Sequence, residues 1–286
     1  MFRSLSGVSN LLGRPANFSS DYLKYFQAAT LIDGSADPTD AFFTLFENNV
    51  FKKIGATDML LFLGAKNATV NILDGSDQAD IQALFDAVLA YVPYGMTTTF
   101  QFEDPTTVYA LNAQLTLAGF FGSGQLNIEG NSSEGGTLHS NQAVVLDWTG
   151  NACNGFVSQF NSVVTNINNI KFIVDDGQIS LFSQRSVQAV NVEGCLMDCT
   201  GTSTTSNGVF FNRSGDGYLK NNYFTAGRYA VRCGINSKVH SWNSNYITTQ
   251  PHTGLRAESG GYISKRDTQP TGSTANESTA FGGNIY

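Results

Sequence analysis

A short phrase recurs through the second half of the chain. It reads as a β-branched residue or Leu, two polar residues or Gly, and then an apolar residue or Asn. Its first residues, spaced by 25, 27, 20 and 24 positions, are Ile167, Val192, Leu219, Val239 and Ile263. A second line, with steps of 22 and 24, runs through Val209, Val231 and Leu255. Repeats of this length indicate stacked units, because no single repeat can bury its own apolar face.

The repeats are short and rich in Gly, Asn, Ser and Thr, which does not suit helical repeats. Strand-length apolar pieces separated by turn residues instead predict a mainly β chain folded as a parallel β-helix. We assign this domain to residues 76–267. A capping helix is expected at about 77–91, where Asp77 precedes an apolar face and Pro93 follows. Such a helix covers the first rung, whose open edge would otherwise invite aggregation.

The flanking segments differ from the repeats. Residues 1–37 have isolated apolar anchors among small and polar residues, which is typical of an arm that docks on a partner or on its own domain. Residues 38–75 are predicted to form a small helical module, because Asp37-Pro38 offers a helix start and the apolar residues from Phe42 to Phe51 follow helical spacing. A second apolar run spans 59–63. Residues 268–286, rich in Ser, Thr and Gly, are predicted to be a linker with a terminal strand.

Composition narrows the function classes. The formal net charge is -7 and no basic cluster exceeds a Lys/Arg pair, which disfavours nucleic-acid binding. The sequence has no stretch of 18 apolar residues, so it does not predict a membrane-spanning helix. The N-terminus also lacks the apolar run of a signal peptide. We therefore expect a chain that is not exported by the usual signal.

The four cysteines and three histidines do not have metal-ligand spacing. Cys195 and Cys199 are four residues apart, and the histidines are scattered. We expect no metal and no cofactor, and we interpret the thiols as small hydrophobic side chains inside the coil.

Several stretches resemble a known family. Asp80–Ala87, Val92–Gly95 and Ala118–Gly130 are similar to the opening of the right-handed, single-stranded parallel β-helix in tailed-phage tail fibres and tailspikes, whose domain is pectate-lyase-like. Gly254–Lys265 and the tail after Thr268 resemble the last rungs of these proteins. The resemblance implies a homotrimeric component of the virion tail, made in the host cytoplasm. It also implies that the N-terminal arm docks on other tail or baseplate proteins, and that the solenoid helps to attach the particle to host-surface polysaccharide.

Few side chains on the rungs are suited to catalysis. β-Helix enzymes that cut polysaccharides gather two carboxylates, one as acid and the other as base or nucleophile. Glu193 and Asp216 are 23 residues apart and are the candidate catalytic pair if they stack on adjacent coils. Asp175-Asp176 precede a glycine and are interpreted as turn residues. Arg213, Arg228 and Arg232 are expected on the outer face, holding acids.

Aromatic residues are the better binding candidates, because rings on a flat β face can stack on sugars. The candidate glycan-binding residues are Tyr218, Tyr223, Trp242 and Tyr246. Packing inside the coil or against a sister chain is the alternative for most of them. Three functions therefore stay open: an adhesive tail fibre or spike, a depolymerase acting as glycoside hydrolase or polysaccharide lyase, and a structural adaptor for another tail component.

Overall fold

The structure is a computed structural model, in which the chain forms two compact units, residues 1–63 and 64–286. For the strands at 26–28, 42–47, 50–55 and 245–246 only the backbone is described. The described residues are 26–28, 42–47, 50–55, 67–88, 90–92, 94–103, 108–130, 144–175, 177–200, 205–246 and 249–286.

The described part of the first unit is an antiparallel sheet of β1 (Phe26–Ala28), β2 (Phe42–Glu47) and β3 (Val50–Gly55). The helix predicted from Phe42 to Phe51 is therefore wrong. Phe, Val and Ile favour strands, and only two asparagines separate Glu47 from its partner Val50, as in a tight hairpin. A short apolar run does not distinguish the two periods. The second expected run, 59–63, and most of the arm, 1–37, lie outside the described residues.

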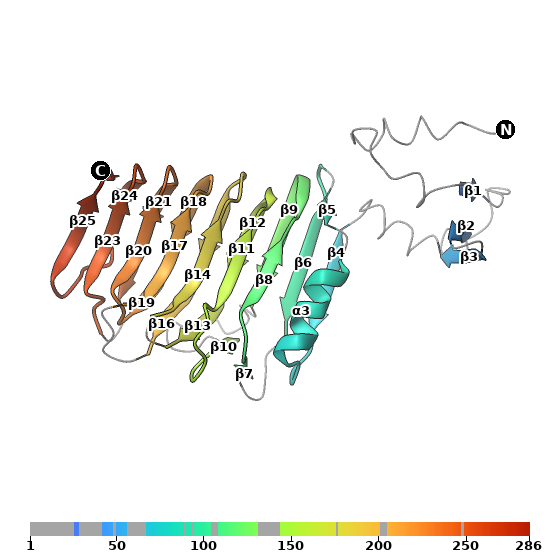
Figure 1. The fold of residues 1–286 in the computed structure, drawn as a ribbon, viewed down its shortest axis with the longest axis horizontal. Coiled ribbons are helices and arrows are strands. Elements are labelled where there is room, and N and C mark those ends of the chain that lie inside the picture. The colour runs from blue at the N-terminus through green and yellow to red at the C-terminus, as the bar shows by residue number, and fades with distance from the viewer. Residues whose placement is uncertain are drawn as a thin grey trace. The chain divides into compact units, whose positions relative to one another are not determined.

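The second unit is a parallel β-solenoid of about seven turns, which confirms the predicted fold class. Its chain passes repeatedly through three sheets, and Figure 1 shows the strands stacked side by side. The ten-stranded sheet contains β4 (Ala68–Ile72), β5 (Tyr91–Val92), β6 (Thr97–Phe102), β9 (Phe121–Glu129), β12 (Ser162–Asn168), β15 (Val190–Glu193), β18 (Asp216–Lys220), β21 (Lys238–Trp242), β24 (Tyr262–Arg266) and β26 (Asn284–Ile285).

The other two sheets complete each turn. The six-stranded sheet contains β7 (Tyr109–Ala110), β10 (Val145–Asp147), β13 (Lys171–Val174), β16 (Leu196–Cys199), β19 (Tyr223–Thr225) and β22 (Asn245–Tyr246). The seven-stranded sheet contains β8 (Leu115–Ala118), β11 (Phe156–Gln159), β14 (Ile179–Gln184), β17 (Asn207–Asn212), β20 (Tyr229–Gly234), β23 (Thr253–Glu258) and β25 (Ala275–Ala280).

The register confirms one predicted line and corrects the other. Val209, Val231 and Leu255 are direct partners in the seven-stranded sheet. In the ten-stranded sheet, however, Leu219 is the partner of Ser241, and Val239 is the partner of Gly217. The apolar residue Val239 therefore lies two positions before the true register partner of Leu219.

This two-position offset has a steric cause. Gly217 occupies a core position, and a Cβ placed on it would lie 2.5 Å from the ring of Phe211. The Phe211 ring, which comes from the seven-stranded sheet, thus fills the space that a side chain at position 217 would take. Because interiors are close-packed, a ring from one sheet can replace an aliphatic side chain from another.

Buried asparagines join neighbouring rungs at two corners. Asn161 is fully buried and accepts from the backbone N–H of Phe120 at 3.0 Å, while its Nδ2 donates to the carbonyl of Leu117 at 3.0 Å. Asn222, also fully buried, accepts from the N–H of Cys195 at 3.0 Å and donates to the carbonyl of Val192 at 2.8 Å. These amides satisfy backbone groups that the turns leave outside the strand ladders.

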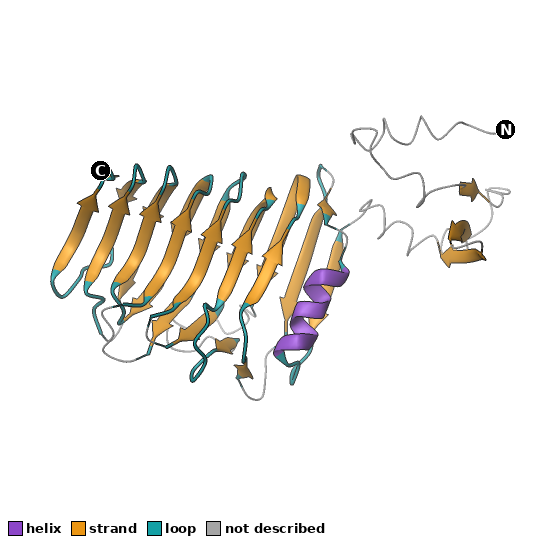
Figure 2. Cartoon of the chain, in the orientation of Figure 1, coloured by secondary structure: helices purple, strands orange, loops and turns teal. Residues whose placement is uncertain are grey.

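The predicted capping helix is present as α3 (Gln78–Ala87), with Asp77 as N-cap in a capping box with Asp80. Figure 2 shows this helix beside the first strands of the solenoid. Ile81 and Phe85 are buried, and the ring of Phe85 makes an edge contact with Phe100, with centroids 4.7 Å apart. The helix thus covers the first turns of the core.

The C-terminal segment is a continuation of the solenoid, and the linker predicted at 268–286 is corrected in part. β25 is paired with β23, and β26 with β24, in the same parallel register as the other rungs. The core column of the seven-stranded sheet passes from Leu255 to Glu277. Glu277 forms an ion pair with Lys265. This rung therefore presents a charged layer of Lys265 and Glu277 beside Ile285, which packs against the apolar core.

Among the described residues, no helix has the length and hydropathy needed to cross a membrane.

Candidate functional site

Three rings lie together on the outer face of the ten-stranded sheet. Tyr218 on β18 is the register partner of His240 on β21, and Trp242 follows two residues later on the same face. The intervening Ser241 is fully buried, whereas the three rings are half-buried. Side chains alternate between faces along a strand, so all three rings point outward.

The rings are stacked. The centroids of Tyr218 and His240 are 4.8 Å apart with planes inclined by 13°. Trp242 lies 5.6 Å from Tyr218 and 5.9 Å from His240, at 23° and 19°. Cross-strand aromatic pairs stabilise a sheet, and this stacking holds the three rings in one orientation. We call this cluster the aromatic row.

An open hollow of about 560 Å³ borders the aromatic row at Trp242. A second hollow of about 300 Å³ shares Asn221 with the first. The lining residues of the first hollow are Lys220, Asn221, Trp242, Asn243, Arg266 and Asp267. Those of the second are Asn168, Asn169, Glu193, Gly194 and Asn221. The two hollows follow the corner where the chain leaves the ten-stranded sheet for the six-stranded sheet.

This corner is formed by residues in the left-handed region. Asn221, Asn243 and Asp267 have φ of 53°, 46° and 59°. Asn and Asp tolerate this conformation better than most residues, which explains why the turn positions carry them. The Asn243 Nδ2 donates to the Asn221 Oδ1 at 2.8 Å. The corner therefore repeats from rung to rung and presents a row of polar side chains.

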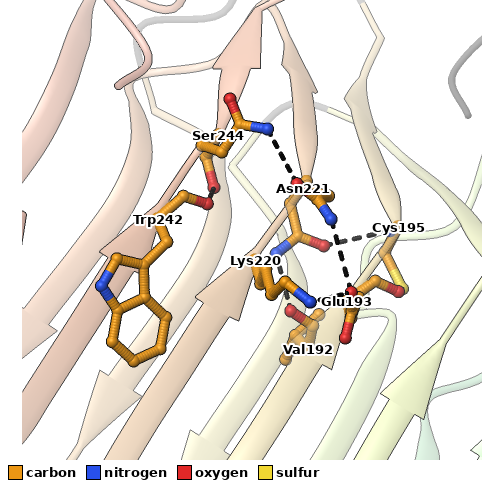
Figure 3. Close-up of polar contacts among 9 residues, drawn as sticks. Val192, Glu193, Cys195, Lys220, Asn221, Trp242 and Ser244 are labelled. Atoms are coloured by element: carbon orange, nitrogen blue, oxygen red, sulfur yellow. Dashed lines mark hydrogen bonds and ion pairs between the residues drawn. The ribbon is translucent and has the colours of Figure 1, made fainter. Parts of the chain in front are cut away.

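Charged groups lie on both sides of Trp242. Its register partners are Lys220 on one side and Arg266 on the other. The Lys220 Nζ donates to the Glu193 Oε1 at 2.7 Å, a contact drawn in Figure 3. The Arg266 Nε lies 3.7 Å from the Asp267 Oδ2, and both side chains are largely exposed.

The floor under these side chains is held by buried polar contacts. The side-chain amide of Asn222 binds the N–H of Cys195 and the carbonyl of Val192, two residues that Figure 3 labels near Glu193. On the next rung the Ser244 Oγ donates to the carbonyl of Trp242 at 3.4 Å. The aromatic row and the hollow thus rest on a backbone whose polar groups are paired.

The two catalytic candidates are not brought together. Glu193 is the register partner of Lys220, whereas Asp216 is the partner of Lys238. Asp216 is therefore four residues away along the strand direction, about 13 Å at the usual rise. Carboxylates that cleave glycosides are about 5–10 Å apart. The register between β15 and β18 is 27 residues, as for Val192 and Leu219, so the 23-residue spacing of Glu193 and Asp216 does not make them partners.

The four aromatic candidates are divided between two sheets. Tyr218 and Trp242 share the aromatic row. Tyr223 lies on the six-stranded sheet, opposite Leu196. Tyr246 belongs to β22, opposite Phe224, and its side chain lies outside the described residues.

Sequence reasoning missed His240, Lys220 and Arg266 as members of the site. Tyr218 and His240 are separated by the same 22 residues that separate the true core partners Leu219 and Ser241, so a correct register would have found them. The sequence predicts that the arginines pair with carboxylates on the outer face. This is confirmed for Arg232, which forms an ion pair with Glu258.

All four cysteines are free, and Cys195, Cys199 and Cys233 are buried. Burial raises the pKa of Cys195 and of Cys233 to about 12, so these thiols are neutral in the fold. The interpretation of the cysteines as core hydrophobes is confirmed for these three. Within the described ranges, no group of three or more His, Cys, Asp or Glu side chains could hold a metal ion.

Comparisons with protein-family models, curated proteins and solved structures give no match for this chain. The parallel β-solenoid is therefore established by the strand pairing alone, and any function must be argued from the aromatic row and its hollow.

Proposed function

We propose that this chain is a glycan-binding β-solenoid that contributes to host-surface attachment as part of a virion tail fibre or spike. The aromatic row of Tyr218, His240 and Trp242 beside an open polar hollow is the observation that carries the proposal. Sugar rings have apolar faces that pack on aromatic rings and hydroxyl groups that need polar partners. The row and the hollow offer both.

The virion setting rests on the resemblance of the rungs to phage tail proteins. In this proposal the solenoids associate as a homotrimer, and the arm at 1–37 docks on other tail or baseplate proteins. A tail fibre needs a long, stiff projecting domain, and the continuous strand pairing from β4 to β26 suits that need.

Binding is favoured over cleavage. The Glu193 carboxylate is neutralised by Lys220, and Asp216 lies too far along the sheet to act with it. A depolymerase needs one carboxyl group to protonate the leaving oxygen while a second attacks or activates water. The adaptor alternative is not favoured by a specific observation, because an adaptor would not require the exposed aromatic row.

The test is retention of the purified chain on host cells and on extracted surface polysaccharide. Trp242→Ala and Tyr218→Ala should each weaken binding about tenfold or more, as expected for central aromatic contacts. Phe160→Ala is the matched control, because Phe160 is 52% exposed at the opposite corner of the ten-stranded sheet. Equal losses in all three variants, or none, would contradict the proposal. New reducing ends from the wild-type chain would instead favour a depolymerase.

Tryptophan fluorescence gives a second readout. The chain has two tryptophans, and Trp148 is fully buried. A ligand on the aromatic row should change the emission of Trp242, so the change should vanish in Trp242→Phe.

A further inference from the structure

The outer face around the aromatic row carries several cations, although the chain is acidic. The outward positions of β18, β21 and β24 carry three cations, Lys220, Lys238 and Arg266, and one carboxylate, Asp216. The chain as a whole has a formal net charge of -7. Glu193 and Asp267 pair with Lys220 and Arg266, so an anionic partner is favoured only where a cation is weakly held.

Within the hollow, Arg266 is the cation with the most binding capacity to spare. Its ion pair with Asp267 is long, at 3.7 Å, and the two side chains are 76% and 63% exposed. Exposed pairs of this kind contribute little, so a ligand can displace Asp267 at small cost. The planar guanidinium has five N–H donors and matches the two oxygens of a carboxylate.

Lys220 adds a second, weaker contact. One of its N–H groups is held by Glu193 at 2.7 Å, and the ammonium group has three donors in total. Lys220 and Arg266 are the register partners of Trp242 on either side, so their backbones lie about one strand spacing from that of Trp242. The Lys220 ammonium group is directed toward Glu193. Glu193 and Asp267 are the acids that oppose the two cations.

We propose that the hollow binds an acidic sugar residue, whose ring packs on Trp242 and whose carboxylate is held by Arg266, with Lys220 assisting. This inference rests on the proposed function, since it names the class of glycan for the same site. The amides of Asn221 and Asn243 line the same hollow and supply partners for the hydroxyl groups. A neutral sugar would use the indole and the amides and leave the guanidinium without a role.

The experiment uses an array of oligosaccharides that contain uronic acid, printed beside the same oligosaccharides after reduction of their carboxyl groups. The full chain should bind the acidic forms about tenfold tighter, because a charged hydrogen-bonded contact is lost on reduction. Arg266→Gln should abolish this preference and leave binding of the reduced forms unchanged. Arg185→Gln is the control, because it makes the same charge change at an exposed position of the opposite corner.

Each result decides between the two proposals. Equal binding of acidic and reduced forms by the wild-type chain would overturn the acidic-sugar inference and leave glycan binding standing. A preference that survives in Arg266→Gln with intact circular dichroism would also overturn it. Binding to neither form would overturn the acidic-sugar inference, and retention on host cells and surface polysaccharide would then decide glycan binding separately. A higher salt concentration should weaken binding of the acidic forms more than binding of the reduced forms, because the contact between Arg266 and the carboxylate is exposed.

Discussion

The side-chain amide of Gln82 forms two hydrogen bonds with the backbone of Thr116, one in each direction. Its Nε2 donates to the Thr116 carbonyl at 2.9 Å, and its Oε1 accepts from the Thr116 N–H at 2.8 Å. Thr116 belongs to β8, the first strand of the seven-stranded sheet. The helix α3 therefore satisfies the open edge of this sheet with one side chain, in the way that a neighbouring strand would.

Gln82→Leu should destabilise the solenoid by about 1–3 kcal/mol, because it leaves a covered donor and acceptor of β8 without partners. Urea unfolding followed by circular dichroism measures the change. Ala83→Gln alters an exposed position on the same helix and should have less than about 0.5 kcal/mol effect. A loss in the control as large as that in Gln82→Leu would mean that α3 is simply fragile.

Asn222 should be among the most sensitive polar positions. Asn222→Ala removes the partners of the Cys195 N–H and the Val192 carbonyl in the buried corner, so we expect a loss of about 2–4 kcal/mol in the free energy of unfolding. Asn191→Ala is the control, because Asn191 is half-buried and makes one side-chain contact, to Asn166. Comparable losses in both variants would contradict a special role for the buried amide.

Thiol reactivity should follow burial. Cys195 and Cys233, whose pKa burial raises to about 12, should react with an aromatic disulfide reagent only after unfolding, since the thiolate is the reacting form. In the native chain at pH 8 we expect no more than one fast thiol, Cys153, because it is only half-buried, although burial raises the pKa of its thiol too. Cys153→Ser should remove that fast phase. Rapid modification of all four thiols would contradict the packed core.

Glu129 should make stability depend on pH. Burial raises the pKa of its carboxyl group above 4.5, although the hydrogen bond from Asn168 opposes the shift. The protonated form is therefore favoured in the fold, and stability is full below pH 4.5 and falls as pH rises through the raised pKa.

Glu129→Gln should accordingly raise the urea midpoint at pH 7.5 and leave it unchanged near pH 3.5. Glu193→Gln, in the same outer row, is the control with the opposite sign, because it removes the exposed ion pair with Lys220 and should destabilise by no more than about 1 kcal/mol. A stabilising effect of Glu129→Gln that persisted at pH 3.5 would show that ionisation is not its cause.

The sequence predicts this fold well where each rung contributes its own core residue. Val209, Val231 and Leu255 are true partners because the seven-stranded sheet keeps an apolar inward position in each of these strands. The prediction fails at Gly217, where the space is filled from another sheet by Phe211. Such a contact joins residues whose spacing carries no periodic signal.

The same limit applies to the site. Tyr218 and Trp242 were found because aromatic residues on rungs are visible in the sequence, and they meet because one strand pair carries both. Tyr223 lies apart from them because Asn221, with φ of 53°, turns the chain into the six-stranded sheet within three residues. One residue with left-handed backbone conformation ends a strand and places the following side chains on another sheet. The sequence shows only that Asn is compatible with that conformation.

The charged layer of Lys265 and Glu277 has a consequence for growth of the solenoid. A second copy laid against β25 would press its own apolar core onto this ion pair, and stripping water from two charges costs several kcal/mol. A parallel sheet edge is otherwise a template on which identical chains can add without limit. The pair therefore opposes stacking of an apolar layer on this rung, because both charges would lose their water.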